Sequence, residues 1–279
     1  MFGGQPVLTL NDGIMIPQLG FGVWQVEDKT APAAVGEALK VGYRLIDTAQ
    51  GYDNEQGVGE AFRASGLGRD DVFITTKLRN REQGYDATLR AFDQSMQKLG
   101  LDVLDLFLIH WPLPDLNTYV ETWKAFVKLK ADGRIRSIGV SNFNPSHLER
   151  IIGETGVTPS VNQIELHPRF QQRAVRDFHA EHGITIESWS PLGQGKVLSD
   201  PVIQAIAEKY GRSAAQVILR WHLEQGLIAI PKSVTPSRIA ENFEIFDFSL
   251  DAEDMAQIDA LDDPNGKIGP DPETFHFKF

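Results

Sequence analysis

Four side chains of complementary chemistry follow apolar segments in the first half of the chain: Asp47, Tyr52, Lys77 and His110. A phenol can donate a proton, and a neighbouring ammonium favours its ionisation because it stabilises the phenolate. A carboxylate could hold that ammonium charged, and an imidazole could hydrogen-bond a carbonyl oxygen. Together these groups predict carbonyl reduction, in which negative charge develops on the oxygen. The set supplies no electrons, so a nicotinamide must provide the hydride.

Each of these residues alone has a simpler explanation. A single Asp or Lys after a strand is usually a cap or a solvated charge, and a histidine in an apolar strand is usually a satisfied core group. The functional interpretation depends on all four occurring at successive predicted strand ends.

The elements that must position these residues alternate between short apolar runs and amphipathic stretches. A hairpin is predicted from Val7 to Ile16, with its turn at Asn11-Asp12-Gly13. Eight strands are predicted over residues 18–22, 44–47, 72–77, 103–109, 135–141, 160–165, 185–190 and 227–231. Helices are predicted over residues 31–40, 55–64, 86–99, 119–131, 145–154, 173–182, 214–225, 236–243 and 252–260. Eight strand–helix units predict an α/β fold, a (β/α)8 barrel, as a single domain over residues 1–279. The tail, residues 262–279, could lie over one mouth of the barrel.

Composition narrows the possible functions. The chain has no cysteine, which excludes disulfides, thiolate zinc sites, iron–sulfur clusters and a cysteine nucleophile. The net charge of −11 disfavours nucleic acid as a partner. No secretory signal is apparent at the N-terminus, and the longest apolar runs, such as 106–109 and 227–230, are too short to span a membrane. We therefore expect a soluble, cytoplasmic monomer that acts on a small molecule.

Other arrangements fit less well. A doubly wound sheet would carry Gly-x-Gly-x-x-Gly after a strand, but Gly20-Phe21-Gly22 and Gly57-Val58-Gly59 both lack the third glycine. No Walker-type phosphate loop occurs either. The pairs Glu165 with His167, and His179 with His182, lack a third ligand at suitable spacing, so we expect no metal site.

The chain closely resembles the aldo-keto reductases from Gly20 to Asn242. The segments that carry the resemblance are Gly20-Phe21-Gly22-Val23-Trp24, Asp47-Thr48-Ala49 with Tyr52, Ile74-Thr75-Thr76-Lys77-Leu78, His110-Trp111-Pro112, Ile138-Gly139-Val140-Ser141-Asn142-Phe143, Asn162-Gln163-Ile164-Glu165-Leu166-His167-Pro168 and Ile230-Pro231-Lys232-Ser233-Val234-Thr235. The stretch from Glu187 to Lys196 is most similar to the bacterial branch containing 2,5-diketo-D-gluconic acid reductases.

The resemblance implies a catalytic tetrad of Asp47, Tyr52, Lys77 and His110, with Tyr52 as general acid and NADPH across the C-terminal mouth of the barrel. It implies reduction of an aldehyde or ketone, such as a diketo-sugar acid or another small polar dicarbonyl. The implied cofactor contacts are Gly22, Val23, Asp47, Ser141, Asn142, Gln163, Trp189, Ser190, Leu192, Gln194, Lys232, Ser233, Val234, Thr235, Arg238, Glu241 and Asn242. The substrate pocket is expected to comprise Trp24, Gln50, Arg79, His110 and Trp111.

The chain departs from the family pattern at two of these pocket positions. Arg79 stands where many relatives carry tryptophan, and Gln50-Gly51 replaces a bulkier apolar pair. A guanidinium beside the substrate would favour anionic or strongly polar carbonyls. The alternative is that Arg79 points to solvent or pairs with an acid such as Glu82.

One further class of function remains open at this point. Relatives include potassium-channel β subunits and lens crystallins, so a binding or structural role on the same scaffold is the second hypothesis. A barrel isomerase or hydrolase would need a metal cluster or paired carboxylates at the mouth, and we find neither.

Overall fold

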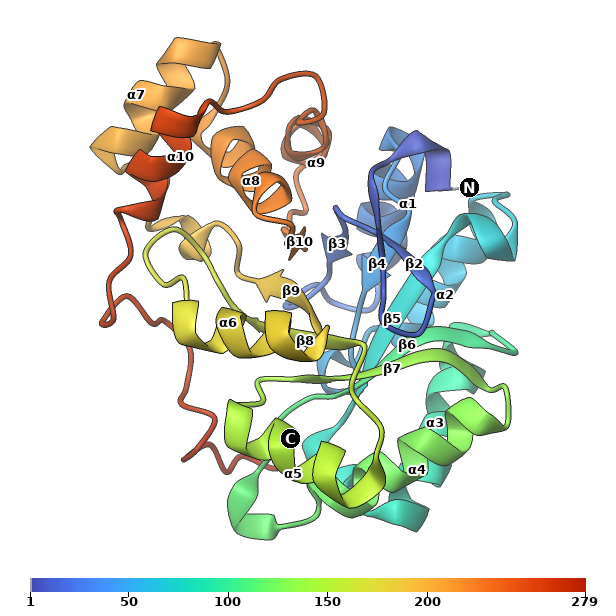
Figure 1. Ribbon diagram of the computed structural model, residues 1–279. Helices are drawn as coiled ribbons and strands as arrows, with labels where there is room; N and C mark the ends of the chain where they lie inside the picture. Colours follow the sequence, from blue (N-terminus) through green and yellow to red (C-terminus); the bar gives the residue numbers. More distant parts are fainter. Residues whose placement is uncertain (1) are drawn as a thin grey trace.

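Eight parallel strands form a barrel in the computed structural model, which describes residues 2–279 (Figure 1). The strands, in their order around the barrel, are β3 (Phe21–Gly22), β4 (Leu45–Asp47), β5 (Phe73–Leu78), β6 (Leu104–Ile109), β7 (Ile135–Ser141), β8 (Val161–Glu165), β9 (Thr185–Trp189) and β10 (Ile228–Ala229). The first and last strands close the ring, because Gly20 donates its backbone N–H to Ala229 at 2.9 Å and Leu19 bridges Ala229. The barrel predicted from the sequence is confirmed.

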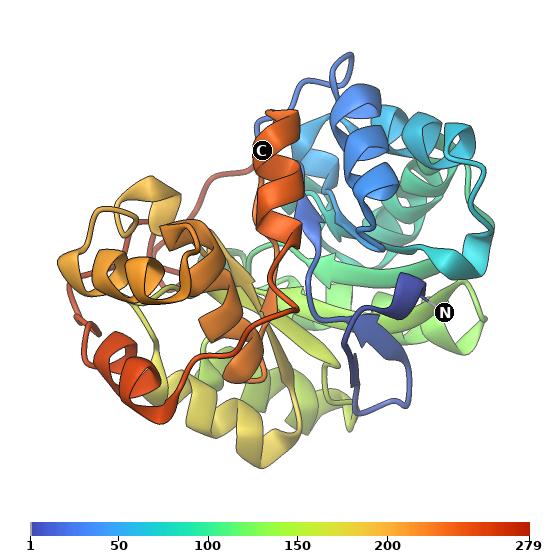
Figure 2. The same cartoon turned by 90° about the horizontal axis from the view of Figure 1, so that it is seen from above.

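Helices surround the barrel and are seen around it from above in Figure 2. They are α1 (Ala31–Val41), α2 (Glu55–Ala64), α3 (Tyr85–Leu99), α4 (Tyr119–Ala131), α5 (Pro145–Thr155), α6 (Arg173–His182), α7 (Pro201–Tyr210), α8 (Ala214–Glu224), α9 (Pro236–Phe243) and α10 (Ala252–Asp259). The sequence analysis missed α7, although its signals were present. Asp200 caps it through Val202, Pro201 occupies its first turn, and Gly211 ends it in the left-handed region.

A hairpin of β1 (Val7–Thr9) and β2 (Met15–Pro17) closes one end of the barrel. Its buried Ile16 belongs to the same apolar cluster as Leu45, Phe73 and Ile228, which lie at the beginnings of their strands. The strand beginnings are therefore sealed by side chains. The opposite end, where the strands finish, opens into the cavity described below.

The C-terminal tail returns to that open end, and in Figure 1 it runs from α10 towards α5. The ring of Phe275 lies 4.1 Å from that of Trp111, and the ring of Phe279 lies 5.2 Å from that of His110, between centroids. The carboxylate of Glu165 accepts the backbone N–H groups of residues 268 and 269 at 2.6 and 2.8 Å. The tail therefore covers part of this mouth, as the sequence suggested.

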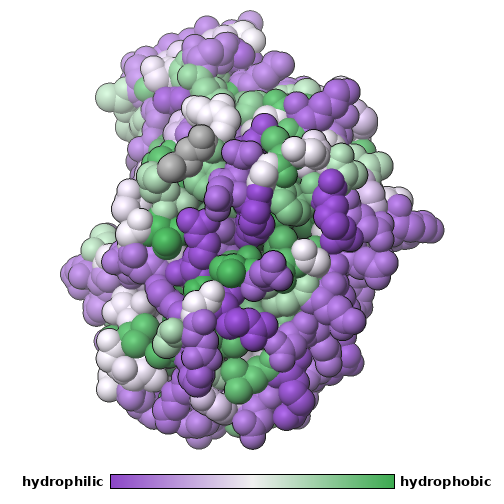
Figure 3. Space-filling model, turned by 90° about the vertical axis from the view of Figure 1, so that its right-hand side faces the viewer, coloured by the Kyte–Doolittle hydropathy of each residue, from purple (hydrophilic) through white to green (hydrophobic). Residues whose placement is uncertain are grey.

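One face of the molecule is mostly polar. On the face shown in Figure 3, hydrophobic residues appear as small separate areas among hydrophilic ones. Across residues 2–279, no helix is both long enough and apolar enough to span a membrane.

Candidate active site

A chain of short contacts joins three residues of the predicted tetrad. Asp47 ends β4, Lys77 lies near the end of β5, and Tyr52 follows β4 in a 3-10 turn over Gln50–Tyr52. The ammonium Nζ of Lys77 lies 2.7 Å from Oδ2 of Asp47 and 3.4 Å from Oη of Tyr52. It also donates to the carbonyl oxygen of Thr48 at 2.9 Å. Both members of this ion pair are almost completely buried, so solvent does not screen it.

Further hydrogen bonds fix the geometry of these residues. Gln163 on β8 donates to Oδ1 of Asp47 at 2.9 Å, which leaves Oδ2 for Lys77. Thr48 donates to the side chain of Asn54 at 2.6 Å, and Asn54 donates to the carbonyl oxygens of residues 23 and 26. The loop that carries Tyr52 is thus tied to the turn after β3.

The electrostatics keep Tyr52 protonated and Lys77 charged. Burial raises the pKa of the Tyr52 phenol, and the Lys77 ammonium opposes that rise without cancelling it. Burial alone would lower the pKa of Lys77, but Asp47 and Tyr52 raise it overall. Burial raises the pKa of Asp47, and Lys77 and Gln163 oppose this. The sequence analysis expected Lys77 to make Tyr52 more acidic. Lys77 does act to lower the pKa of Tyr52, but the rise caused by desolvation is larger.

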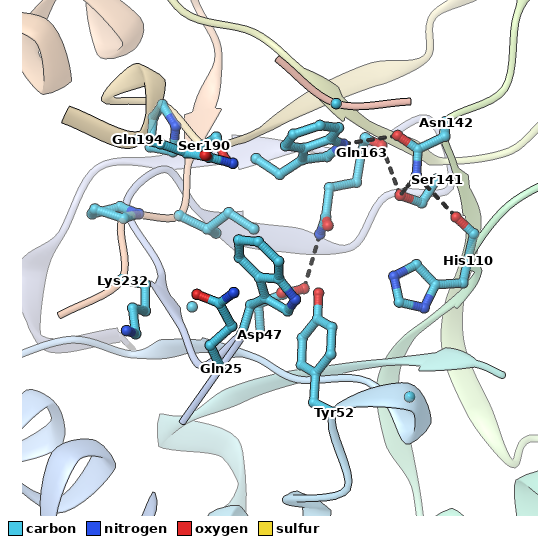
Figure 4. Close-up of a pocket in the computed structure, with 18 of the residues that line it drawn as sticks. Gln25, Asp47, Tyr52, His110, Ser141, Asn142, Gln163, Ser190, Gln194 and Lys232 are labelled. Carbon is cyan, nitrogen blue, oxygen red and sulfur yellow. Dashed lines mark hydrogen bonds between the residues drawn. The ribbon is translucent and has the colours of Figure 1, made fainter. Parts of the chain in front are cut away.

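His110, which follows β6, faces Tyr52 across the cavity (Figure 4). The two rings meet edge to face with centroids 5.7 Å apart. Burial, with the nearby Lys77 charge, lowers the pKa of His110 well below its usual value, so the ring is neutral. Its Nδ1 is buried and has no partner among the described residues. If Nε2 carries the single proton, the ring can donate it towards the cavity.

These groups stand at one side of a cavity of about 650 Å³ at the open mouth of the barrel. The cavity brings together most of the residues predicted from the sequence. These are Gly22, Trp24, Asp47, Tyr52, His110, Trp111, Ser141, Asn142, Gln163, Trp189, Ser190, Leu192, Gln194 and Lys232. Lys77 lies beneath the lining, where it contacts Asp47 and Tyr52.

A hydrogen-bonded group of polar side chains, which includes Ser141, Asn142 and Gln163, lines this cavity (Figure 4). The indole Nε1 of Trp189 donates to Oδ1 of Asn142 at 2.8 Å, and Asn142 donates to the carbonyl oxygen of His110 at 3.0 Å. Ser141 donates to the backbone of Gln163 at 2.8 Å. Asn142 and Ser190 have positive φ angles of 61° and 47°, so the chain turns sharply where β7 and β9 end.

The remaining predicted cofactor contacts lie on α9 or in the segment just before it. Lys232 and Arg238 are exposed there, and neither forms an ion pair with another residue between 2 and 279. Lys232 lines the cavity, whereas six residues of this group do not: Ser233, Val234, Thr235, Arg238, Glu241 and Asn242. Val23, predicted at the other end of the site, is buried and also lies outside the lining. The positive end of the α9 dipole and two cations make this a suitable place for an anion.

Two predicted substrate residues do not reach the cavity, and this corrects the sequence analysis. The guanidinium of Arg79 pairs with Asp53 and donates to the carbonyl oxygen of Gln50 at 2.5 Å. The side chain of Gln50 points into the barrel wall, where it donates to Ser95 at 2.7 Å and to the carbonyl oxygen of Ala91 at 2.8 Å. Arg79 therefore does pair with an acid, but with Asp53 rather than the suggested Glu82.

The sequence analysis did not predict several other residues that line the cavity, and the most important of these belong to the C-terminal tail. Gly269, Pro270, Phe275 and Phe279 line the cavity, as do Gln25, Gly51, Pro191, Gly195, Ile230 and Pro231. Gly51 was noticed only as a departure from the family pattern. A Cβ atom at Gly51 would lie 2.7 Å from the ring of Phe279, so the absence of a side chain there makes room for the tail.

The fold and this site define a carbonyl-reducing barrel enzyme, and comparison with known proteins agrees. Residues 18–263 match the Aldo/keto reductase family, and this chain belongs to that family. It is 57% identical over 272 residues to an aldo-keto reductase of Mycolicibacterium smegmatis, covering 98% of each chain. It is 51% identical over 271 residues to the methylglyoxal reductase DkgA of Escherichia coli K12, covering 96% of this chain and 98% of the relative.

Solved structures show the same similarity. A variant of the protein Gox0644, crystallised in complex with NADPH, superposes with a TM-score of 0.95 at 55% identity. The superposition covers 98% of this chain and all of that one. An aldo/keto reductase from Brucella melitensis is 59% identical, with a TM-score of 0.90 over 92% of this chain.

Proposed function

We propose that this enzyme reduces a small polar aldehyde or ketone with NADPH, and that Tyr52 donates the proton to the carbonyl oxygen. The observation that carries the proposal is the position of Tyr52. Its hydroxyl lies 3.4 Å from the buried Lys77 ammonium and faces His110 across the cavity. When the phenol gives up its proton, the ammonium stabilises the phenolate, and Asp47 keeps the ammonium in place. A neutral His110 donates a hydrogen bond that orients the carbonyl oxygen.

The cavity fits an extended nicotinamide dinucleotide. Bound NADPH supplies the hydride. The ring of Trp189 and the polar groups of Ser141, Asn142 and Gln163 would hold the nicotinamide end. A Cβ atom at Gly22 would lie 3.1 Å from the carbonyl oxygen of Ile230, so a side chain there would crowd the backbone at this edge of the cavity. At the far end, Lys232 and Arg238 would meet the 2′-phosphate.

The walls near His110 favour a small dicarbonyl such as methylglyoxal as substrate. Besides Tyr52 and Trp189, the aromatic residues Trp24, Trp111, Phe275 and Phe279 line the cavity. The charged residues among its lining are Asp47 and Lys232, and Asp47 is committed to Lys77. Among residues 2–279, the lining of the cavity includes no arginine that could bind the carboxylate of a sugar acid. The DkgA relatives are named methylglyoxal reductases, which supports the same choice. A diketo-sugar acid is the alternative, and the ratio of kcat/KM on methylglyoxal and on 2,5-diketo-D-gluconate distinguishes the two.

Replacement of the proposed acid tests the mechanism. Tyr52→Phe keeps the ring and removes the proton donor, so carbonyl-reduction turnover falls by at least about a hundredfold. The affinity for NADPH, followed by quenching of tryptophan fluorescence, stays nearly constant. Tyr43→Phe is the matched control, because it removes another buried hydroxyl, which donates to the carbonyl oxygen of Ile239 on α9. Near-normal turnover of Tyr52→Phe would refute the assignment.

A further inference from the structure

A second carboxyl group lies inside the barrel beside the tetrad, and the mechanism above does not use it. Glu187 stands on β9 two residues before Trp189, so both side chains lie on the same face of the strand. Trp189 lines the cavity, and Glu187 is therefore directed into the barrel interior below it. In the parallel sheet it is paired with Gln163 on one side and Ile228 on the other.

Glu187 is completely buried and poorly supplied with hydrogen bonds. Its exposed fraction is 0%, and neither carboxyl oxygen has a partner among residues 2–279. Gln163 is its polar neighbour on β8, and the amide of Gln163 donates to Asp47 at 2.9 Å. The same amide opposes the rise in the pKa of Glu187 but does not cancel it. An ionised carboxylate that accepts no close hydrogen bond is strongly disfavoured in such a buried place. The protonated acid is the form that this environment accepts.

The charges that act on Glu187 belong to the tetrad. Its strand partner Gln163 is hydrogen-bonded to Asp47, which places Glu187 next to that carboxylate in the barrel. The Asp47 carboxylate on β4 and the Lys77 ammonium on β5 act on the pKa of Glu187, and the charge of Glu187 acts on the pKa of the Tyr52 phenol. The paired residues on β8 and β10, Gln163 and Ile228, are uncharged. Burial and the negative charge of Asp47 raise the pKa of Glu187 to about 8, and Lys77 and Gln163 oppose this rise.

We propose that Glu187 is a positioning residue that acts through its protonation state. As the neutral acid, Glu187 leaves Asp47 as the only counter-ion of Lys77. When Glu187 loses its proton, a second negative charge lies beside the tetrad. The proposal rests on the roles assigned above to Tyr52 and Lys77. A second carboxylate opposes formation of the Tyr52 phenolate and competes with it for the ammonium. Proton donation to the substrate therefore weakens when Glu187 ionises.

The first test is the pH dependence of kcat/KM for methylglyoxal in the wild type and in Glu187→Gln. If only the enzyme with neutral Glu187 is active, the wild-type value falls by about tenfold from pH 7 to pH 9, because one pH unit above the pKa leaves about one molecule in eleven protonated. A glutamine cannot ionise. The ratio of the value at pH 9 to that at pH 7 is thus expected to be about tenfold higher in Glu187→Gln.

The matched control is Glu55→Gln. Glu55 is also a buried acid whose pKa is raised by burial, but it hydrogen-bonds Thr76 at 2.6 Å and stands outside the tetrad. Its replacement should leave the ratio of the two kcat/KM values as in the wild type. The proposal would be overturned if the wild type and Glu187→Gln gave the same ratio of kcat/KM at pH 9 to kcat/KM at pH 7. It would also be overturned if Glu55→Gln changed this ratio as much as Glu187→Gln does.

A second test does not depend on turnover. Because the pKa of Glu187 is raised in the folded state, its contribution to stability is complete at about pH 4.5 and is lost as the pH rises towards 8. The melting temperature of the wild type should therefore fall relative to that of Glu187→Gln between pH 5 and pH 9. A constant difference would show that Glu187 does not titrate there, and would refute the proposal. If Tyr52→Phe kept near-normal activity, the proposed function would be refuted instead. The stability measurement on Glu187→Gln would still be valid in that case.

Discussion

The carboxylate of Glu165 accepts the backbone N–H of Gly269 at 2.8 Å and so ties the C-terminal tail to the end of β8. A Cβ atom at Gly269 would lie 2.4 Å from the ring of Trp189, so the tail backbone packs directly against the tryptophan proposed to stack on the nicotinamide. His167 contacts the same carboxylate at 3.1 Å. One acidic side chain thus connects the tail to the wall of the cofactor site.

Glu165→Gln should release the tail. The variant replaces a charged acceptor of two backbone bonds with an amide that offers one oxygen, and such bonds are worth about 1.5–3 kcal/mol. We expect hydrogen exchange in residues 262–279 to accelerate by about tenfold or more. The control is Glu273→Gln, which changes a half-exposed tail residue near His147. Its effect should be smaller, because exposed pairs contribute about 0–1 kcal/mol. Equal acceleration in both variants would contradict the anchoring role of Glu165.

Arg238→Ala should weaken NADPH binding and leave NADH binding nearly unchanged. A charge-assisted contact to the 2′-phosphate is worth about 1.5–3 kcal/mol, or roughly ten- to hundredfold in affinity. Titration of tryptophan fluorescence with each cofactor measures the effect. Arg90→Ala, an exposed arginine on α3, is the control and should bind both cofactors like the wild type. If Arg238→Ala lost affinity for both cofactors equally, a contact to the 2′-phosphate would be excluded.

Arg79→Ala should change stability rather than substrate preference. The variant loses the pairing with Asp53 and the bond to the carbonyl oxygen of Gln50, which precedes Tyr52 by two residues. A loss of about 1–2 kcal/mol corresponds to a melting temperature lower by about 2–8 °C. The ratio of kcat/KM on a keto-acid and on a neutral aldehyde should stay constant. Arg81→Ala, which removes an exposed pair with Glu82, should barely change the melting temperature. A selective loss on the keto-acid would restore Arg79 to the substrate pocket.

His222→Gln should make the protein more resistant to acid. His222 is fully buried on α8, and its ring nitrogens lie 2.8 and 3.2 Å from the carbonyl oxygens of Ile218 and Leu166. Burial lowers the pKa of His222 to about 4, so its contribution to stability is present above pH 6.5 and is lost as the pH falls towards 4. Between pH 6.5 and 5 the wild type should lose about 2 kcal/mol relative to the variant. Urea denaturation at the two pH values measures this, with the exposed His276→Gln as control.

The sequence predicted the barrel because its strands are short apolar runs separated by amphipathic helices, a pattern that depends on local residues alone. The positions of Asp47, Lys77 and His110 at strand ends followed from the same pattern, since parallel strands finish on one side. The direction of Arg79 could not be predicted, because it depends on which acceptors the preceding loop presents. The contacts of the C-terminal tail could not be predicted either. Phe275 and Phe279 meet residues far away in the sequence, and no periodicity marks such contacts.

The closure of the ring between Leu19 and Ala229 has a consequence for biosynthesis. These residues are more than two hundred positions apart, so the ribosome must translate most of the chain before the first strand can meet its second neighbour. Until then the growing sheet has two open edges, β3 and the newest strand, which can pair with other chains. Nascent chains that stop before residue 229 should therefore depend on chaperones, and the completed protein should not.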